Sequence, residues 1–520
     1  MARGISPVPF RYLRYYLPQT LAEVSFHLGM IKDVPIASIP PGGCADATNF
    51  LLEYPGRIIK RSGWGYQGSA AGANTNPGYM VSAPVFNGSA RVIVNPQDGH
   101  LYDVTSTASD RGGSFPITID TPKMYPYSTD KLIVTNSDGA TGPTKVYLSG
   151  GNVTFGALGG SPPAGKYAAI YANRLVLGGS TANPNRVYFS PAPDVEGTWD
   201  TTNSFIDTSR PITGLASVQG ALLVFSADGV ERIIGDIPPG NDGDNMSIQQ
   251  IGSMGCADAR TIASWGTNII FASRDGVYVT NGSGFDSITD EPNGLGIGTF
   301  YRLYYANAVL NSGQLAGGVL GQKHYFLSIN TSGSPITLCC YLPTKTWYQV
   351  SNMACTMYAT GPYSVSASIA ANYDELYGSR FSTTTGHRVI KHTLTMDPAA
   401  ILTQDADGTD VHATIQTRMI GDGIGLKAYE FGHITYDASA SPGLAITVER
   451  GINAQGTNFT PPESPLTDSS LQRRRFTINM DAQGIVYNLT TSNAVAKCHI
   501  YAIETEVREV TYGNAEFVNA

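Results

Sequence analysis

Four aspartates carry the carboxylates in this sequence whose spacing suits acid–base chemistry: Asp228, Asp242, Asp244 and Asp275. Glycoside hydrolysis needs two carboxyl groups that flank one bond, about 5 to 10 Å apart. If the fold gathers these aspartates in one cleft, the chain can bind or cleave carbohydrate. A carbohydrate-binding or depolymerase-like protein that recognises a host surface is therefore one hypothesis for its function.

Two of these aspartates also have a structural explanation. Ser226-Ala-Asp228-Gly and Ser273-Arg-Asp275-Gly resemble the start of the Asp box of sialidase-type propellers, but neither is followed by the tryptophan that completes the box. A hairpin turn capped by a serine hydroxyl accounts for both segments without an enzyme. The sequence also contains no G-x-S-x-G elbow, H-E-x-x-H pair or Walker A loop. We predict that the protein is not an enzyme.

Two acidic segments have alternating carboxylates, an arrangement that offers oxygen ligands to Ca²⁺. One contains Asp405, Asp407 and Asp410, and the other is Asn241-Asp242-Gly-Asp244-Asn245. Neither has the spacing of a twelve-residue calcium loop or its bidentate glutamate. We interpret both as acidic turns in solvent and predict no cofactor.

Charged and aromatic residues near the two ends of the chain are the predicted subunit contacts. In a strand, Arg473 and Arg475 share one face and Arg474 takes the other. Three arginines on an edge strand either bind an acidic partner or oppose aggregation. Residues 1–60 are irregular and mildly basic, and we expect them to lie on a neighbouring subunit. The predicted interface residues are Arg11, Tyr12, Arg14, Tyr15, Tyr16, Arg473, Arg474 and Arg475.

Pairs of strand-like runs joined by short turns recur along the chain. The turn centres lie near residues 98, 138, 181, 228, 275, 333 and 372, and four of the turns are Asp-Gly, a strong hairpin signal. A hairpin every ~40 to 50 residues is typical of a β-propeller, in which each blade is a four-stranded sheet. We predict an all-β fold with a propeller-like domain of about six to eight blades. A protein of several β-sandwiches is the alternative.

The pattern changes at Asp405–Asp410, which we interpret as a domain boundary. Enough strands for one β-sandwich follow. They are predicted at Val411–Met419, Lys427–Tyr436, Leu444–Arg450, Arg473–Met480, Val486–Leu489 and Lys497–Arg508. The predicted domains are an irregular N-terminal docking arm (1–60), the propeller-like domain (61–404) and a C-terminal sandwich (411–520). Helical signal is sparse, and the best candidate is Leu17–Met30.

Composition excludes several classes of protein. Charged residues are 14% of the chain, against ~25% in ordinary globular proteins, so a coiled coil is excluded. Hydrophobic residues at 42% exclude a disordered chain, and the net charge of −8 opposes a basic nucleic-acid-coating surface. The N-terminus does not read as a secretory signal, and no apolar run is long enough for a transmembrane helix. The six cysteines contain no C-x-x-C pair, and we interpret them as small buried hydrophobic residues.

Several short motifs in this sequence point to one family. Residues 42–63 contain an asparagine segment, a strand and then Lys60-Arg61-Ser-Gly63. Asn183-Pro184-Asn-Arg186 is followed by Trp199, and a further strand-rich segment runs from Ile212 to Gly235. Near the C-terminus, strands are expected at Arg473–Thr477 and Ile503–Arg508. These motifs resemble, in order, the entry motif, two successive blades and the closing sandwich of tailed-bacteriophage virion propellers of the podovirus tail nozzle, or hub, type.

This resemblance implies a structural virion protein without catalytic residues. Members form a homohexameric ring below the portal and its adaptor, contact tail fibres or spikes, and continue the DNA-ejection channel. Genomic DNA would pass through without specific binding. The net charge of −8 fits an acidic channel wall, because like charge keeps DNA from adhering. The implied location is the virion tail, after synthesis in the host cytoplasm.

Overall fold

The computed structural model divides into two compact units, residues 62–411 and residues 1–61 together with 412–520. It describes residues 19–23, 26–54, 57–71, 80–82, 85–86, 89–95, 100–112, 124–127, 130–136, 138–290, 295–310, 314–330, 335–361, 375–380, 387–392, 404–405, 407–421, 427–438, 443–450, 459–467, 470–491 and 498–509. These residues are mostly strand. Within them the one α-helix is α1 (Gly298–Leu310), and the short 3₁₀ turns are η1 (Ile36–Ser38) and η2 (Ala259–Thr261). The prediction of a helix at Leu17–Met30 is wrong, because Gln19–Glu23 forms strand β1, which pairs with a distant strand.

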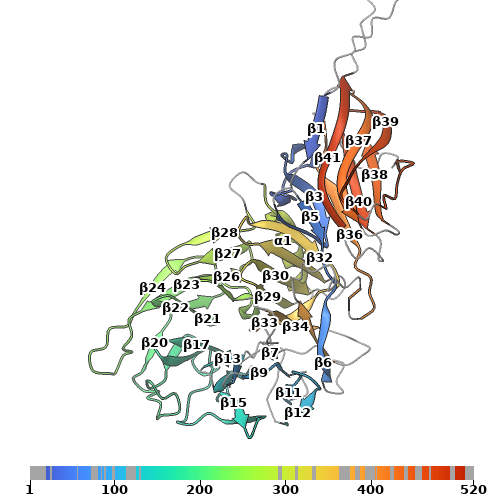
Figure 1. Cartoon of the computed structure of the whole chain (residues 1–520). Coiled ribbons are helices and arrows are strands. Elements are labelled where there is room, and N and C mark those ends of the chain that lie inside the picture. The colour runs from blue at the N-terminus through green and yellow to red at the C-terminus, as the bar shows by residue number, and fades with distance from the viewer. Residues whose placement is uncertain are drawn as a thin grey trace, which may run out of the picture. The chain divides into compact units, whose positions relative to one another are not determined.

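Residues 62–411 contain a series of four-stranded antiparallel sheets, which follow one another around the unit in Figure 1. In chain order, the sheets are β7 (Met80–Ser82), β10 (Ile93–Asn95), β11 (Tyr102–Asp103) and β12 (Ser109–Asp110); β13 (Met124–Pro126), β14 (Lys131–Val134), β15 (Thr144–Ser149) and β16 (Asn152–Ala157); β17 (Tyr167–Tyr171), β18 (Arg174–Gly178), β19 (Arg186–Phe189) and β20 (Phe205–Asp207); β21 (Ile212–Val218), β22 (Ala221–Ser226), β23 (Val230–Ile234) and β24 (Ser247–Gly252); β25 (Ala263–Trp265), β26 (Asn268–Ala272), β27 (Val277–Thr280) and β28 (Phe285–Ser287); and β29 (Gln314–Leu320), β30 (His324–Asn330), β31 (Ile336–Tyr341) and β32 (Thr346–Val350). A small hairpin of β8 (Val85–Phe86) and β9 (Ser89–Ala90) lies between β7 and β10.

A seventh sheet closes this series with a strand from its other end. It contains β33 (Cys355–Gly361), β34 (Glu375–Arg380) and β35 (His387–His392), and its fourth strand is β6 (Gly65–Ala71). The first strand of this sheet, β33, lies against β7, the first strand of the first sheet. The described part of residues 62–411 is therefore a seven-bladed β-propeller, within the predicted range of six to eight blades.

Hydrophobic residues from neighbouring blades form shared cores. One core contains Met357 of the seventh blade, Ile93 of the first and Leu132 of the second. Other clusters join the second blade to the third, the third to the fourth and the fourth to the fifth. The second strands read as continuous apolar runs, such as Ala221–Ser226, because both of their faces are covered by a neighbouring blade. Burial of apolar surface between blades thus holds the propeller together.

The Asp-Gly turns were the main sequence evidence for blades. Those near 138, 228 and 275 join the second and third strands of their sheets, as the hairpin pattern predicts. The turn predicted near 372 falls between β33 and β34, the first and second strands of its sheet. The turn residues near 98, 333 and 372 themselves lie outside the described residues.

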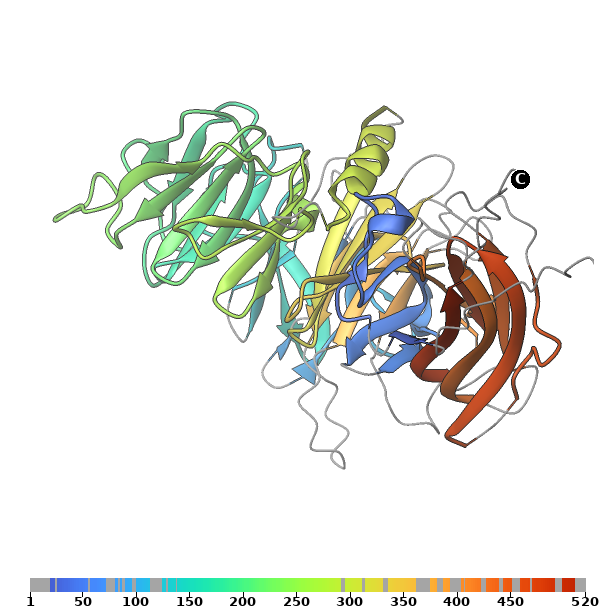
Figure 2. The same cartoon turned by 90° about the horizontal axis from the view of Figure 1, so that it is seen from above.

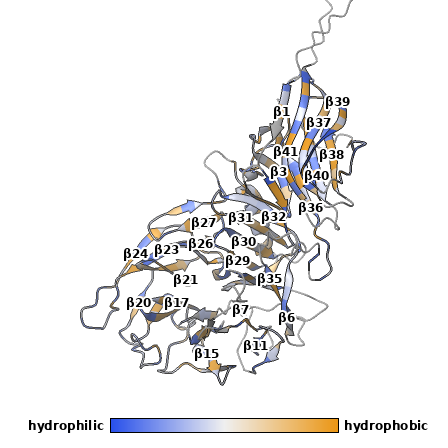
Figure 3. Cartoon of the chain, viewed as in Figure 1, coloured by the Kyte–Doolittle hydropathy of each residue, from blue (hydrophilic) through white to orange (hydrophobic). Residues whose placement is uncertain are grey.

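The other unit is a β-sandwich built from both ends of the chain. One sheet has the order β39 (Gln472–Ala482), β37 (Lys427–Ala438), β41 (Cys498–Glu509), β5 (Arg57–Lys60) and β4 (Phe50–Tyr54), with β1 also pairing with β41. The other contains β3 (Gly43–Thr48), β36 (Ala413–Thr417), β40 (Ile485–Thr491) and β38 (Leu444–Arg450), with β2 (Gly29–Met30) beside β3. Hydrophobic and hydrophilic residues alternate along β37, β39 and β41 in Figure 3, as expected for strands with one buried face.

This arrangement differs from the predicted irregular arm at residues 1–60. Within the described parts of residues 19–60, β1, β3 and β5 pair with C-terminal strands more than 350 residues away, for example Ala47 with Ile415, while β2 pairs with β3 and β4 with β5. The sequence pattern of residues 1–60 has no long alternating run, so only these distant partners make it strand. Residues 1–18, with the predicted contacts Arg11, Tyr12, Arg14, Tyr15 and Tyr16, lie outside the described residues.

An ion-pair cluster between two blades yields a prediction about acid stability. The Glu196 carboxylate lies 2.8 Å from the Lys131 ammonium and 2.5 Å from that of Lys145, both on the preceding blade. These hydrogen bonds lower the pKa of Glu196 from 4.5 to about 2. Because the folded pKa is depressed, this stabilisation is present above pH ~4.5 and is lost as pH falls towards ~2.

We expect Glu196→Gln to reduce the free energy of unfolding by about 2 kcal/mol at pH 7, because two charge-assisted hydrogen bonds are lost. The difference from the parent should shrink below pH ~4.5 and vanish near pH ~2. Urea denaturation at a series of pH values measures it. Asp242→Asn, which removes the same charge from an exposed loop, is the control. A Glu196→Gln deficit that persists unchanged at low pH would contradict the ion-pair explanation.

Candidate interaction surface

The four aspartates proposed for carbohydrate chemistry do not come together. Asp228 lies in the turn between β22 and β23, and Asp275 lies in the equivalent turn of the next blade. Asp242 and Asp244 lie in the loop between β23 and β24, at the opposite end of β23. The five residues of β23 span roughly 16 Å. The carboxylates are therefore divided between two ends of the propeller.

Arg274 lies between the two aspartates that do share an end. Its guanidinium is 3.8 Å from the Asp228 carboxylate and 3.5 Å from that of Asp275, and all three side chains are more than half exposed. The Ser226 hydroxyl donates to the Gly229 carbonyl at 2.9 Å. This is the serine-capped hairpin turn expected from the sequence, and its aspartate faces solvent beside an arginine.

Helix α1 packs beside these turns, on the connection between the fifth and sixth blades. Its buried residues Tyr301 and Ala308 face the protein, and the Tyr301 hydroxyl donates to the Ser273 carbonyl. Arg302 donates to the Asp275 carbonyl at 3.1 Å and pairs with Asp290 at 3.1 Å. Two contacts therefore hold α1 against the fifth blade: the buried hydrogen bond of the Tyr301 hydroxyl and the surface ion pair of Arg302 with Asp290.

Two apolar side chains of α1 are exposed to solvent. Leu303 is 68% exposed and Val309 is 59% exposed. Phe300 and Tyr304 are half-buried on the same helix, with ring centroids 4.8 Å apart. These four residues are referred to below as the α1 surface, and Figure 2 shows α1 as a yellow-green helix at the edge of its unit. At 3.6 residues per turn, Leu303 and Val309 lie about 120° apart around the helix, so they are separate exposed positions, and each would lose its contact with water under a partner protein.

The sequence did not predict the α1 surface. Residues 298–310 have apolar and aromatic side chains on nearly all sides, so they lack the amphipathic period that identifies a surface helix. The available signal was negative: from Thr299 to Leu310 there is no glycine or proline to interrupt a helix.

The interpretation of the Asp405–Asp410 segment as a turn in solvent is wrong for Asp405, which is buried, and both Asp405 and Asp407 have protein donors. The Asp405 carboxylate accepts the Trp64 backbone N–H at 3.1 Å and the Asn352 amide at 3.0 Å. The Asp407 carboxylate accepts from Arg380 at 2.7 Å. Burial raises the pKa of Asp407, but hydrogen bonds from a backbone N–H, Arg380 and Asn352 outweigh it and lower the pKa to about 2. We call these five residues the closure cluster, since they tie the segment before β6 to the last blades.

The third aspartate of that turn, Asp410, accepts a hydrogen bond from the Gln404 amide at 2.7 Å. Among the described residues, no group of three or more His, Cys, Asp or Glu side chains is arranged to hold a metal ion. All six cysteines are buried, as predicted.

The arginines of β39 lie on the sandwich and contact its own residues. Arg473 donates to Glu504 at 3.1 Å, and the Arg475 guanidinium lies 3.3 Å from the centre of the Phe431 ring. Both arginines are exposed and face the same side of the sheet, as the strand alternation predicts. Arg474 is also exposed. Whether they contact another subunit stays a prediction.

The motif at residues 42–63 has a structural role in the sandwich. Asn49 is buried and adopts a left-handed conformation, with φ of 59°. Its amide donates to the His412 carbonyl at 2.6 Å, and its side-chain oxygen accepts from buried Arg61 at 2.7 Å. Asparagine tolerates this backbone conformation better than most residues. The motif thus joins the N-terminal strands to the C-terminal half of the unit.

The net charge is unevenly distributed along the sequence. Residues 62–411 contain 18 basic and 26 acidic residues, so the propeller accounts for the whole net charge of −8. Residues 1–61 and 412–520 together contain 15 of each. A negative potential is therefore a property of the propeller and not of the sandwich.

Among the described residues, no helix is long and apolar enough to cross a membrane.

The strand order defines the class of this protein: a β-propeller, seven-bladed in its described residues, with a β-sandwich formed by both chain ends. No protein-family model matches the sequence, and no curated protein does either. Among solved structures, BamB from Moraxella catarrhalis is 14% identical to this chain. The match spans 73% of this chain and 98% of the BamB chain, with a TM-score of 0.34. The β-propeller domain of Myceliophteria thermophila Cps50 (Swd1) is 13% identical, and the match spans 52% of this chain and 81% of that domain, with a TM-score of 0.31. An ancestral GH74 enzyme is 13% identical, and the match spans 68% of this chain and 51% of the enzyme chain, with a TM-score of 0.36.

Proposed function

We propose that this chain is a structural subunit of a bacteriophage tail, which assembles with copies of itself into a nozzle ring. Six copies surround a channel that continues the path of the ejected DNA, below the portal and its adaptor, and the ring's outside contacts tail fibres or spikes. The sequence motifs that resemble podovirus nozzle proteins support this assignment. The observation that carries it is the α1 surface, because Leu303 and Val309 are 68% and 59% exposed on a folded helix and gain from a protein partner.

In this proposal, DNA passes along the axis of the oligomer and not through the propeller. The described first strands, which lie nearest the propeller axis, contain no charged residue: β7, β13, β17, β21, β25, β29 and β33. The described acidic residues of the propeller instead lie in turns or in the second to fourth strands of their blades. Six propellers that direct such turns towards one axis form an acidic wall, which repels DNA and prevents adhesion.

Particle mass tests the assembly. We expect mass photometry of the purified chain to show a species near six times 55.2 kDa, with ring-shaped views of the same sample in negative stain. A sample that remains a 55.2 kDa monomer at micromolar concentration would contradict self-assembly. Ring-shaped particles with another number of copies would retain the structural role and correct the symmetry.

Substitutions on α1 test whether its surface is the subunit contact. We expect Leu303→Asp and Val309→Asp each to reduce the fraction of assembled particles at least about tenfold, because a charge buried in an apolar interface without a partner is costly. The matched control is Ile234→Asp, since Ile234 is an exposed apolar residue (39%) on another blade, away from α1. All three variants should keep the parent's circular dichroism spectrum. Equal assembly of the α1 variants and the control would remove α1 from the interface.

A further inference from the structure

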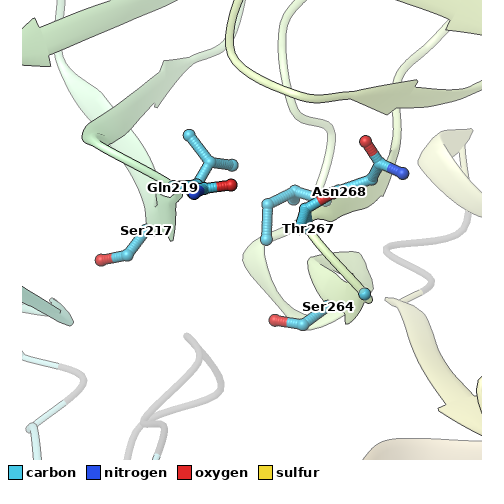
Figure 4. A pocket seen from close by; sticks show the side chains of 8 residues that line it. Ser217, Gln219, Ser264, Thr267 and Asn268 are labelled. Carbon is cyan, nitrogen blue, oxygen red and sulfur yellow. The ribbon is translucent and has the colours of Figure 1, made fainter.

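A shallow pocket opens at the end of the propeller formed by the turns between first and second strands. Its walls are the β21–β22 turn of the fourth blade and the β25–β26 turn of the fifth, and its volume is about 380 Å³. In Figure 4, Ser217 and Gln219 lie on one side, and Ser264, Thr267 and Asn268 lie on the other. The pocket is at the opposite strand ends from Asp228 and Asp275, so it is separate from the α1 surface.

Hydrogen bonds from the neighbouring blades fix both walls. The Ser217 hydroxyl donates to the Ile170 carbonyl of the third blade. On the other wall, the Gly266 backbone N–H donates to the Gln322 side chain at 2.8 Å, and the Trp265 indole donates to the Gln322 carbonyl at 2.9 Å. Each wall is therefore hydrogen-bonded to the blade on its outer side, the third blade for the β21–β22 wall and the sixth for the β25–β26 wall.

The polar groups that face the pocket are neutral and open to solvent. Gln219, Ser264 and Thr267 are exposed, and Asn268 is half-buried. No hydrogen bond joins any of these four side chains to the rest of the described structure. Val218 and Ile269 also line the pocket, but they are 9% and 3% exposed and belong to the core shared by the fourth and fifth blades. The lining contains no charged side chain.

We propose that this pocket binds a neutral sugar unit of a glycan. Side-chain amides and hydroxyls both donate and accept, as sugar hydroxyls do. An anionic ligand would require a cationic partner, and the lining offers none. The volume lies at the lower end of the ~300 to 1,000 Å³ range of small-ligand sites and holds about one or two rings. Affinity in the millimolar range is expected, because the site is open and shallow.

Saturation-transfer difference NMR on the full chain tests this inference. The probes are the methyl glycosides of glucose, galactose, mannose and N-acetylglucosamine, with methyl glucuronide as the anionic comparison. We expect saturation transfer to at least one neutral glycoside and a weaker effect on the glucuronide. No transfer to any neutral probe at 10 mM, on the order of the expected dissociation constant, would overturn the proposal, as would stronger binding of the glucuronide.

Substitutions of pocket residues test whether the sugar binds in this pocket. Gln219→Ala and Asn268→Ala each remove one side-chain amide, and we expect the double variant to weaken binding about tenfold. Gln250→Ala, which truncates an exposed side chain of the same propeller outside the pocket, should bind like the parent. Unchanged binding in the double variant would place the sugar elsewhere and refute the site. The pocket lies within one chain, so this result is independent of whether the proposed ring assembles.

Discussion

Replacing Trp64 with alanine is expected to lower the free energy of unfolding of the propeller by about 3 to 5 kcal/mol, the usual cost of removing a fully buried tryptophan. Trp64 is 1% exposed. Its indole N–H donates to the Asn352 carbonyl at 3.0 Å, and the Arg380 guanidinium lies 4.6 Å from its ring centre. It directly precedes β6, the strand that completes the seventh blade. Alanine would leave a cavity where the two ends of the propeller meet.

A graded substitution separates the packing of Trp64 from its hydrogen bond. Trp64→Phe keeps an aromatic ring beneath Arg380 but loses the N–H donor to Asn352, so we expect a smaller cost of about 1 to 2 kcal/mol. Urea denaturation followed by far-UV circular dichroism measures both variants without using tryptophan emission. A cost below about 1 kcal/mol for Trp64→Ala would show that the closure cluster does not hold the propeller together.

The repeating hairpins could be predicted because their signal is local. An Asp-Gly turn between two apolar runs depends on a dozen neighbouring residues, so the blades around Asp228 and Asp275 were visible in the sequence. The same locality explains the sandwich strands, such as Leu444–Arg450, which the structure reproduces with the predicted bounds. The alternation that placed Arg473 and Arg475 on one face is a local property of strands as well.

Long-range pairings could not be predicted in this way. β1, β3 and β5 pair with strands that lie hundreds of residues later, and nothing in their own sequence identifies those partners. β6 reads Gly-Tyr-Gln-Gly-Ser-Ala-Ala, with too few apolar residues for a strand signal. The four aspartates show the same limit for a site, because opposite ends of β23 separate Asp228 from Asp242 and Asp244. Only the blade geometry decides which side chains meet.

Gly68, in the middle of β6, gives the second large effect. Its φ is +64°, a left-handed conformation that costs other residues about 1 to 2 kcal/mol. A Cβ at this position would lie 2.3 Å from the Val104 carbonyl oxygen, which is backbone and cannot rotate away. The flanking residues bind the same segment, since Gln67 donates to the Thr105 carbonyl at 2.6 Å and the Ser69 hydroxyl accepts from Ala108 at 2.7 Å. β6 therefore connects the seventh blade to the first.

We expect Gly68→Ala to destabilise the propeller by about 2 to 4 kcal/mol, because backbone strain and overpacking add at one position. Gly65→Ala is the matched control: it lies in the same strand, and an added Cβ there has no atom within 4 Å. Its effect should stay within about 0.5 kcal/mol. Urea denaturation gives both values, and hydrogen exchange of residues 65–71 and 387–392 should be faster only in Gly68→Ala, since β6 pairs with β35. Equal stability of the two variants would mean that the propeller does not depend on the contact of β6 with its first blade, and the closure would then rest on the pairing of β6 with β35 alone.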